Sequence, residues 1–293
     1  MRRGRSRRVG ILGHIDRPAV RDEARRIARR LTRRGHRVRI EARLAEQMDE
    51  PGAPLQEIAS WCQTLVALGG DGTALLGARA LVGRRGALLP INLGGLGFLT
   101  VAESREADAA LDSALGDAWP TARRGMVSAR LIRGDRTIRR GVAMNDAVIK
   151  GASGFAAIHL RLRALEHDLG LLVADGLIIA TAAGSTAYSL SAGGPLLTPD
   201  VEALVVTPVC AHSLGSRSMV LPPDAEVAVR VIGGDDRGLL VLDGQDRVEL
   251  MPRDRVHARL VRDALRVYQN PERSFARALQ AKLGWQGSAK RSR

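Results

Sequence analysis

The sequence is poor in cysteine, in aromatic residues and in long apolar runs. Its two cysteines, Cys62 and Cys210, form no C-x-x-C pair, which argues against a disulfide framework or a zinc site and agrees with a cytoplasmic location. Aromatic residues make up 3% of the chain, so the core must consist mainly of Val, Leu, Ile and Ala. Apolar runs such as 177–183 and 204–206 are too short to span a membrane. We therefore expect a cytoplasmic protein with no membrane partner.

Basic residues, in contrast, are abundant, and almost all of them are arginine. The formal net charge is +14, and of the 45 basic residues only Lys150, Lys282 and Lys290 are lysines. Such a charge first suggests a nucleic-acid partner, but the arginines are spread along the chain and are locally dense only in 2–8 and 21–39. Aromatic residues for base stacking are not interleaved with them. Because a basic field also suits nucleotides, we expect a small polyanion and no specific nucleic acid.

The stretch 64–80 predicts an anion-binding turn at the end of a strand. Leu65–Leu68 are of the buried-strand type, the chain breaks at Gly69–Thr73 (GGDGT), and a small-residue helix is expected from Ala74. Glycines let the backbone approach a phosphate, and a helix N-terminus directs N–H groups and a positive dipole end toward it. The carboxylate of Asp71 is expected to hold a metal ion or to take a proton from an attacking hydroxyl. The alternative is an ordinary Asp-Gly turn.

A second glycine loop follows the next predicted strand. Residues 87–91 are apolar, and the loop Asn92–Leu99 (NLGGLGFL) comes directly after them. Upstream, a strand over 9–13, a helix over 20–34 and a strand over 38–40 have the order of a parallel α/β layer. Ligands lie at the carboxyl ends of the strands in such a sheet. We therefore expect this loop to form a wall for a flat ring or a sugar, although its glycines could equally serve the backbone alone.

The pattern of apolar residues changes from helical spacing to short alternating runs after Trp119-Pro120, and we place a domain boundary there. Short alternating runs predict a β-rich domain, in which 256–268 has the pattern of a pair of strands. An amphipathic helix with a glycine stop is expected over 274–283. The chain is thus divided into a basic disordered tail (1–8), an α/β domain (9–120), a β-rich domain (121–268) and a C-terminal helix with its tail (269–293).

Residues 181–195 are dense in hydroxyl groups and almost free of bulky side chains. Small residues let a ligand approach the backbone, Ser and Thr supply short donors, and Tyr188 supplies a ring for stacking or a phenol for a hydrogen bond. A flexible Ser/Gly linker is the alternative. The core-like runs 177–180 and 196–197 disfavour a linker, so we expect a ligand-binding turn.

The glycine loops and the hydroxyl-rich turn belong to a longer series of motifs. In order they are Gly69–Thr73, Asn92–Leu99, Asn145-Asp146, Asp175–Leu177, Gly184–Pro195, Asp243–Gln245 and Lys282–Trp285. In this order and spacing they resemble the motifs of bacterial NAD kinases, from about residue 9 to residue 285. The first motif is weak evidence by itself, because lipid kinases and phosphofructokinases have relatives of it. The alternatives are a related lipid or sugar kinase, which the 184–195 stretch disfavours, and a non-enzymatic binder of nucleotide or nucleic acid.

The resemblance implies a fold and an activity. It implies an N-terminal α/β domain with a Rossmann-like parallel sheet, a β-rich NAD-binding domain, and a last helix that packs back on the first domain. The implied reaction transfers a phosphoryl group from ATP, or from inorganic polyphosphate, to the 2′-hydroxyl of the adenosine ribose of NAD. It implies a requirement for a divalent cation such as Mg²⁺. It also implies a homodimer or homotetramer whose site is completed across subunits.

The resemblance further assigns roles to the glycine loops. Asp71 would be the general base that accepts the 2′-hydroxyl proton. Gly72 would lie against NAD or the phosphates, and Phe98 would close the wall of the pocket. The phosphate-donor loop would include Gly69, Gly70 and Thr73.

The remaining roles fall in the β-rich domain. Asn145 and Asp146 would bind the adenine side of NAD, Asp175 would bind its nicotinamide end, and Gln245 would be a further contact. The dinucleotide would be lined by Thr186, Ala187, Tyr188, Ser189, Leu190 and Ser191. No residue is assigned as a dedicated metal ligand.

Four departures from the family pattern lie in the same domain. Asp146 stands where Glu is usual, which shortens its reach by one methylene. Ala182-Ala183 replace a usual Pro-Thr and remove a rigid kink and a hydroxyl. Val173 replaces a frequent Arg, which bears on the discrimination between NAD and NADH, and Ser218 replaces a usual Pro. None of these changes touches Asp71.

Overall fold

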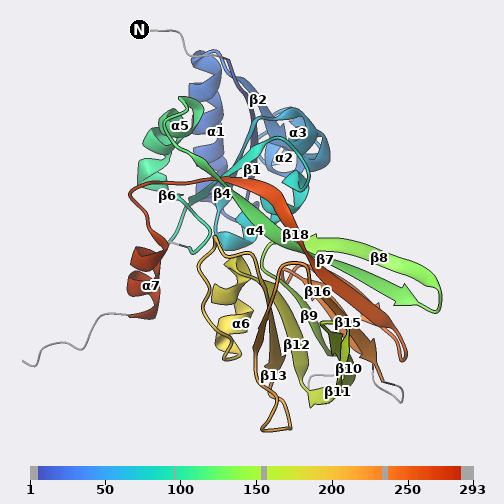
Figure 1. Ribbon diagram of the computed structural model, residues 1–293. Helices are drawn as coiled ribbons and strands as arrows, with labels where there is room; N and C mark the ends of the chain where they lie inside the picture. Colours follow the sequence, from blue (N-terminus) through green and yellow to red (C-terminus); the bar gives the residue numbers. More distant parts are fainter. Residues whose placement is uncertain (1–5, 96, 153–156, 233–236, 285–293) are drawn as a thin grey trace, which may run out of the picture. The chain divides into compact units, whose positions relative to one another are not determined.

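The computed structural model describes residues 6–95, 97–152, 157–232 and 237–284 (Figure 1). They form two units, one from the N-terminal part up to Ala122 together with the chain from Leu265 onward, and the other from Arg123–Ala264. Most of the predicted tail 1–8, the predicted motif residue Trp285 and the tail after it lie outside the described residues.

The first unit contains a parallel sheet. Its strand order is the end of β18, then β5, β4, β1, β2 and β3, with β6 paired beside the end of β5. All of these pairings are parallel, which confirms the α/β prediction. The strands are β1 (Arg8–Gly13), β2 (Arg37–Glu41), β3 (Gly52–Ala53), β4 (Thr64–Gly69), β5 (Ala87–Asn92), β6 (Ala102–Glu103) and the last residues of β18 (Arg255–Tyr268).

Helices cover both faces of this sheet because its central strands are apolar on both sides. Val9 and Ile11 belong to the core cluster shared with α1 and α5, whereas Leu12, from the opposite face of β1, lies beside Gly77 of α4. An ion pair of 2.8 Å between Arg26 and Asp108 joins α1 to α5. The helices are α1 (Pro18–Arg33), α2 (Ala42–Glu46), α3 (Leu55–Trp61), α4 (Asp71–Leu81), the 3-10 turn η1 (Ser104–Glu106), α5 (Ala107–Leu115) and α7 (Phe275–Leu283).

The second unit is a pair of antiparallel sheets around one apolar core. One sheet has the order β11-β10-β15-β18, with the β7–β8 hairpin beside β18, and the other has the order β14-β13-β12-β9-β16-β17. Its elements are β7 (Thr121–Arg133), β8 (Arg136–Ala143), β9 (Asp146–Gly151), β10 (Ile158–Ala164), β11 (His167–Ala174), β12 (Gly176–Thr181), η2 (Ala183–Thr186), α6 (Tyr188–Ser191), β13 (Leu204–Val209), β14 (Met219–Leu221), β15 (Glu226–Val231), β16 (Gly238–Leu242), β17 (Asp246–Leu250) and most of β18.

Two details differ from the sequence prediction. The expected strand pair over 256–268 is wrong, because β18 is one continuous strand of 14 residues. No Gly, Pro or Asn interrupts this stretch, and the left-handed φ of 50° that Asp263 adopts does not end the strand. In addition, α4 begins at Asp71 rather than at Ala74.

The C-terminal helix α7 returns to the first unit, as the resemblance implied. Its N-terminus is capped by Ser274, whose hydroxyl accepts a hydrogen bond from the N–H of Arg277, and it ends at Gly284 with a φ of 60°. The ammonium group of Lys282 lies 4.6 Å from the centroid of the Phe98 ring, and Arg273 pairs with Glu106. Within the described ranges, no helix is long and apolar enough to cross a membrane.

Candidate active site

The turn from β4 into α4 carries the first part of the site. The carbonyl of Gly70 accepts hydrogen bonds from the N–H groups of Thr73 (3.0 Å) and Ala74 (3.2 Å), which start the helix. Asp71 therefore sits in the first helical turn, half-buried, and Gly72 is exposed. The side chain of Thr73 is buried against the turn. The Asp71 carboxylate therefore lies at the N-terminus of a helix and beside a glycine turn, which is the kind of place where phosphate binds.

The second glycine loop fixes the orientation of that carboxylate. Its two oxygens accept hydrogen bonds from the backbone N–H groups of Phe98 (3.2 Å) and Leu99 (3.3 Å). A Cβ atom on Gly97 would lie 1.9 Å from Oδ1 of Asp71, so only glycine lets the loop come this close. Each carboxylate oxygen retains a further acceptor position. Asp71 is held in place and still able to accept a proton or a metal ion.

The loop after β5 is also ordered by its own polar groups. Oδ1 of Asn92 accepts a hydrogen bond of 2.8 Å from the N–H of Gly94, and the N–H of Leu93 donates to the carbonyl of Gly69 at 3.2 Å. The carboxyl ends of β4 and β5, at which the sequence analysis placed the two glycine loops, therefore meet. Leu96 of this motif lies outside the described residues.

In the second unit, Asp243 organises the turn that precedes β9. This residue has a left-handed φ of 51°, and its carboxylate accepts hydrogen bonds from the N–H groups of Met144 (3.0 Å), Asn145 (2.8 Å) and Asp146 (3.4 Å). Sequence reasoning assigned no site role to Asp243, because an Asp-Gly pair is an ordinary turn. The structure shows that it holds the backbone of both predicted adenine-side residues.

The two residues that Asp243 holds are unusual in their environment. Burial, and secondarily the negative charge of Asp243, raises the pKa of Asp146 to about 7. Oδ1 of Asn145 is buried and has no hydrogen-bond partner among the described residues. A buried acceptor without a partner costs free energy, and such groups gather at functional sites.

The hydroxyl-rich stretch is a packed turn and not a linker. The hydroxyl of Thr181 donates to the carbonyl of Met144 at 2.6 Å, and that of Ser185 donates to the carbonyl of Ala182 at 2.7 Å. A Cβ on Gly184 would lie 2.0 Å from the carbonyl oxygen of Asn145. The lack of side-chain bulk therefore lets this turn lie directly on the Asn145 backbone.

A cavity of about 360 Å³ opens at this place. It brings together four of the predicted residues, Asn145, Asp146, Ala187 and Tyr188. Tyr188 is 45% exposed, so its ring is accessible to a ligand. The cavity is also lined by Val148, Lys150, Val241, Asp243, Gly244 and Arg247, and of these the two basic residues were not singled out in the sequence.

The other predicted residues of this unit lie elsewhere. Ser189 is fully buried and its hydroxyl is 2.9 Å from that of Thr207. Asp175 is exposed directly before β12, whereas Asp146 pairs with Ala180 near the opposite end of that strand. Five residues of extended chain separate the two levels by about 16 Å. Of the remaining four, Thr186 and Leu190 are half-buried and Ser191 and Gln245 are exposed.

The residues of the candidate site fit a metal ion that is held mainly by the phosphates of a bound substrate. Among the described residues, no group of three or more His, Cys, Asp or Glu side chains is placed to hold a metal. Mg²⁺, however, typically keeps several waters and uses one or two carboxylates together with substrate phosphates. Asp71, with acceptor positions left after its two N–H bonds, suits the role of such a single carboxylate.

An α/β unit whose glycine turn presents a fixed carboxylate at a helix N-terminus, joined to a β-sandwich with a polar cavity, is characteristic of a nucleotide-binding phosphotransferase. The chain matches the family models of the ATP-NAD kinase N-terminal domain over residues 9–118 and of its C-terminal domain over residues 144–269. It is 37% identical over 246 residues to the NAD kinase of Geobacter metallireducens, covering 84% of this chain and 87% of that one. The chain therefore belongs to the NAD kinase family.

Solved structures agree with this assignment. Yeast NADH kinase complexed with NADH matches with a TM-score of 0.89 and 25% identity, over 98% of this chain and 90% of that chain. An NAD kinase from Archaeoglobus fulgidus in complex with ATP shares the fold, with a TM-score of 0.77 and 23% identity over 96% of this chain and 100% of that chain. The protein is thus an enzyme that phosphorylates NAD to NADP, which excludes the lipid- or sugar-kinase and non-enzymatic alternatives.

Proposed function

We propose that Asp71 is the general base of this NAD kinase and that the turn Gly69–Thr73 binds the phosphoryl donor. The observation that carries the proposal is the pair of hydrogen bonds from the N–H groups of Phe98 and Leu99 to the Asp71 carboxylate. These bonds fix a proton acceptor at the N-terminus of α4. Both the carboxylate and the phosphate-binding backbone are thereby held before substrate arrives.

The role of Asp71 follows from the weak acidity of the ribose hydroxyl group that receives the phosphoryl group. A ribose hydroxyl has a high pKa, so a carboxylate contributes only as the proton leaves in the transition state. The new bond forms between the ribose 2′-oxygen and the transferred phosphorus, the bond to the donor's bridging oxygen breaks, and Asp71 takes the hydroxyl proton. The N-terminus of α4 and the turn Gly69–Thr73 would stabilise the phosphate charge. A bound Mg²⁺ would neutralise further charge on the donor.

The NAD molecule is assigned to the cavity of the second unit. Oδ1 of Asn145, which lacks a partner among the described residues, would accept a hydrogen bond from the adenine side of NAD. Asp146 would donate or accept there according to its protonation, because its pKa is about 7. Tyr188 would stack on a ring. The proposed contacts also include Phe98, Thr186, Ala187, Leu190, Ser191 and Gln245, whereas the buried Ser189 would support the turn through its hydroxyl pair with Thr207.

We further propose that Asp175 serves the NAD of a neighbouring subunit. It lies beyond the end of β12 opposite to the Asn145-Asp146 turn, so one subunit's cavity does not contain it. A homodimer or homotetramer would bring it to the nicotinamide end of a ligand held by the partner. The oligomer is testable by sedimentation velocity, and Asp175→Ala should raise the KM for NAD without changing stability.

The proposed donor is ATP, with inorganic polyphosphate as the second possibility, and the proposed compartment is the cytoplasm. Both cysteines are free thiols, which suits a reducing compartment. The purified protein should be incubated with NAD and Mg²⁺ and with either ATP or polyphosphate, and NADP should be followed with an NADP-specific dehydrogenase. Product with one donor only identifies that donor. No product from either, by folded protein that binds NAD, would overturn the assigned chemistry.

A further inference from the structure

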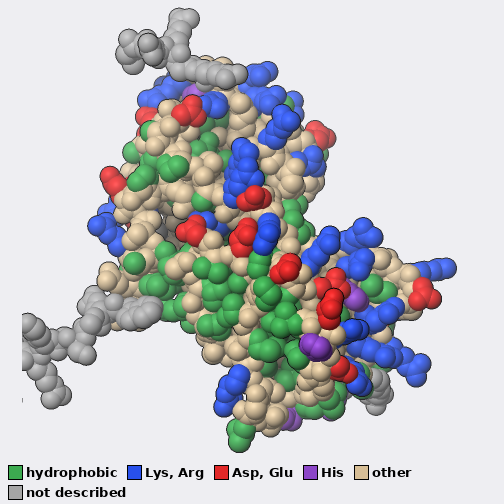
Figure 2. Space-filling view, in the orientation of Figure 1, with side chains coloured by type: hydrophobic (Ala, Val, Ile, Leu, Met, Phe, Trp, Pro, Cys, Tyr) green, Lys and Arg blue, Asp and Glu red, His purple; other side chains and the backbone are tan. Residues whose placement is uncertain are grey.

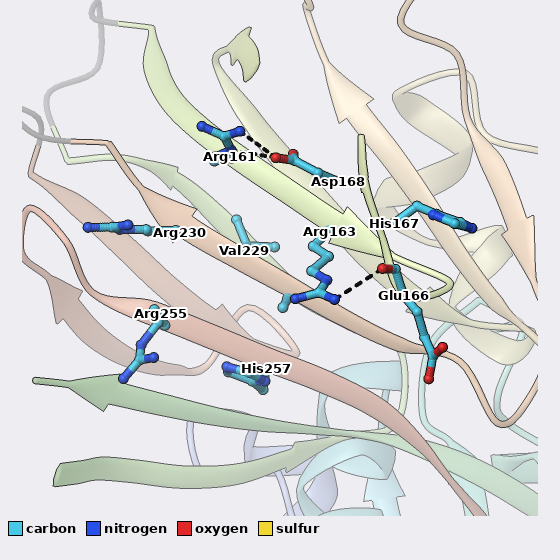
Figure 3. A pocket seen from close by; sticks show the side chains of 10 residues that line it. Arg161, Arg163, Glu166, His167, Asp168, Val229, Arg230, Arg255 and His257 are labelled. Carbon is cyan, nitrogen blue, oxygen red and sulfur yellow. Dashed lines mark hydrogen bonds and ion pairs between the residues drawn. The ribbon is translucent and has the colours of Figure 1, made fainter. Parts of the chain in front are cut away.

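Three arginines stand side by side across the second unit, and none of them lines the cavity that contains Asn145 and Asp146. The register of β10 with β15 places Arg161 opposite Arg230, and the register of β15 with β18 places Arg230 opposite Arg255. All three are exposed. Figure 3 shows them on three neighbouring strands. We call Arg161, Arg230 and Arg255 the arginine row.

Such a row is electrostatically unfavourable without a ligand. Like charges directly opposite each other on neighbouring strands destabilise a sheet. Asp168 compensates Arg161, but Arg255 donates to the neutral carbonyl of Gly134 at 2.7 Å. Arg230 has no ion-pair or hydrogen-bond partner among the described residues. Two of the three charges are therefore not matched by a described carboxylate.

The row borders a hollow that is large enough for a small ligand. A cavity of about 500 Å³ is lined by the row together with Arg163, Glu166, His167, Asp168 and His257. Arg163 donates to the carbonyl of Glu166 at 3.1 Å, again a neutral acceptor, and His257 lies 2.6 Å from a carboxylate oxygen of Glu226. The lining therefore combines several guanidinium groups with fewer acidic ones.

The arrangement differs from the rest of this arginine-rich surface. On the face shown in Figure 2, basic side chains are scattered with acidic side chains between them. Some arginines of the first unit have carboxylate partners, as Arg30 has Asp112 at 2.9 Å. Arginines also oppose each other in pairs elsewhere, as Arg130 opposes Arg140, whereas the arginine row joins three arginines across three neighbouring strands.

We propose that the arginine row binds an oligophosphate chain, inorganic or carried by a nucleotide, at a site that shares no residue with the active site. Planar guanidinium groups pair with phosphate oxygens through two parallel hydrogen bonds. Strands lie roughly 4.8 Å apart, so the Cα atoms of the row span about 10 Å. A chain of linked phosphates can run along that span, whereas a single phosphate has fewer oxygens to share among three guanidinium groups.

The proposal is tested by titrating the full-length protein with sodium tripolyphosphate in a calorimeter. The test variant is Arg230→Gln with Arg255→Gln, and the matched control is Arg136→Gln with Arg140→Gln. The control pair is exposed on β8, lies outside the cavity, and removes the same charge. ATP, NADPH and orthophosphate are then added as competitors. The kcat for NAD phosphorylation is measured on every variant and should not change.

The expected result is that wild type and control bind one more tripolyphosphate than the test variant does, or bind it about tenfold or more tightly at that site, since two charge-assisted contacts are lost. The unfolding midpoint of the test variant should not fall, because a like-charge pair is removed. If that variant does not fold, Arg230→Gln alone replaces it. Competition by ATP or NADPH for the additional tripolyphosphate, the one that the test variant lacks, identifies a nucleotide-borne chain. If neither competes for that additional site, the ligand is the inorganic chain.

Two results would overturn the proposal. One is equal stoichiometry and affinity in wild type and test variant. The other is an equal loss of tripolyphosphate binding in the control variant, which would show that the effect comes from the net charge of the protein and not from the arginine row. The readout is binding and not turnover, so failure of the arginine-row proposal leaves the assigned role of Asp71 untouched, and an inactive enzyme leaves the binding test valid.

Discussion

Gly97 and Asp71 are in such close approach that a Cβ on Gly97 would lie 1.9 Å from the Asp71 carboxylate. The glycine is needed because the two residues that follow it, Phe98 and Leu99, donate their N–H groups to that carboxylate. The loop after β5 thus acts on the residue that follows β4. The two glycine motifs 69–73 and 92–99 therefore act together to position one carboxylate.

Gly97→Ala should displace the Asp71 carboxylate from its position. A shift of about 1 Å in a catalytic group can lower turnover by about 100-fold, so kcat should fall on that scale. Gly95→Ala is the matched control, because Gly95 lies in the same loop with no atom near its Cβ position. Steady-state kinetics and thermal unfolding of both variants check the prediction. Wild-type kcat in folded Gly97→Ala would contradict the positioning role.

Asp71→Asn should fold, bind NAD and lose turnover by about 100-fold or more, which is the usual scale for a general base. The asparagine carbonyl still accepts one of the two backbone N–H bonds, so the loop is partly retained. Isothermal titration with NAD separates binding from chemistry. A variant that turns over at the wild-type rate would remove Asp71 from the proposed role.

Asp243→Asn should destabilise the protein. The side chain loses its charge and presents an NH₂ group to backbone donors from Met144, Asn145 and Asp146. We expect a loss of about 2 kcal/mol in the free energy of unfolding, since hydrogen bonds to charged groups are the strong ones. Asp246→Asn is the control, because its exposed pair with Arg139 should contribute about 1 kcal/mol or less. Urea unfolding curves should therefore give a larger loss in the free energy of unfolding for Asp243→Asn than for Asp246→Asn.

The architecture was predictable because its signals are local. Alternating strands and helices gave the parallel layer of the first unit, and successive short β runs gave the second unit. The single strand β18 was not predictable as such. Its length is decided by pairing with β15, β7 and β5, which lie far away in sequence. No residue within 256–268 signals the change of partner from β15 to β5 between Arg259 and Arg266.

Part of the candidate site was also predictable. Asp71 could be chosen because a carboxylate in a glycine turn is unusual beside a phosphate. The support for Asn145 from Asp243 could not be found, because an Asp-Gly turn looks the same whether or not its side chain serves a distant segment. Likewise, the buried pairing of Ser189 with Thr207 depends on tertiary packing that a run of hydroxyl residues does not reveal.

Asp146 predicts a pH dependence of stability. Its pKa is about 7 in the folded protein because burial, and then the charge of Asp243, disfavours the ionised form, whereas it is about 3.9 in an unfolded chain. A carboxyl whose pKa is raised on folding costs no stability below its unfolded pKa, and the cost grows as the pH rises and is complete above about 7. Asp146→Asn abolishes this titration with little change in shape.

The unfolding midpoints of wild type and Asp146→Asn should therefore be compared from pH 5 to pH 8, in about half-unit steps. The advantage of Asp146→Asn over wild type should increase through this range and level off above about 7. Both proteins share every other titrating group, so the difference isolates Asp146. A constant difference across the range would show that this carboxyl is already ionised at pH 5 in the folded protein, which would contradict the raised pKa. Adding NAD at each pH then reports which protonation state the ligand prefers, since a ligand that binds one form better shifts the curve toward it.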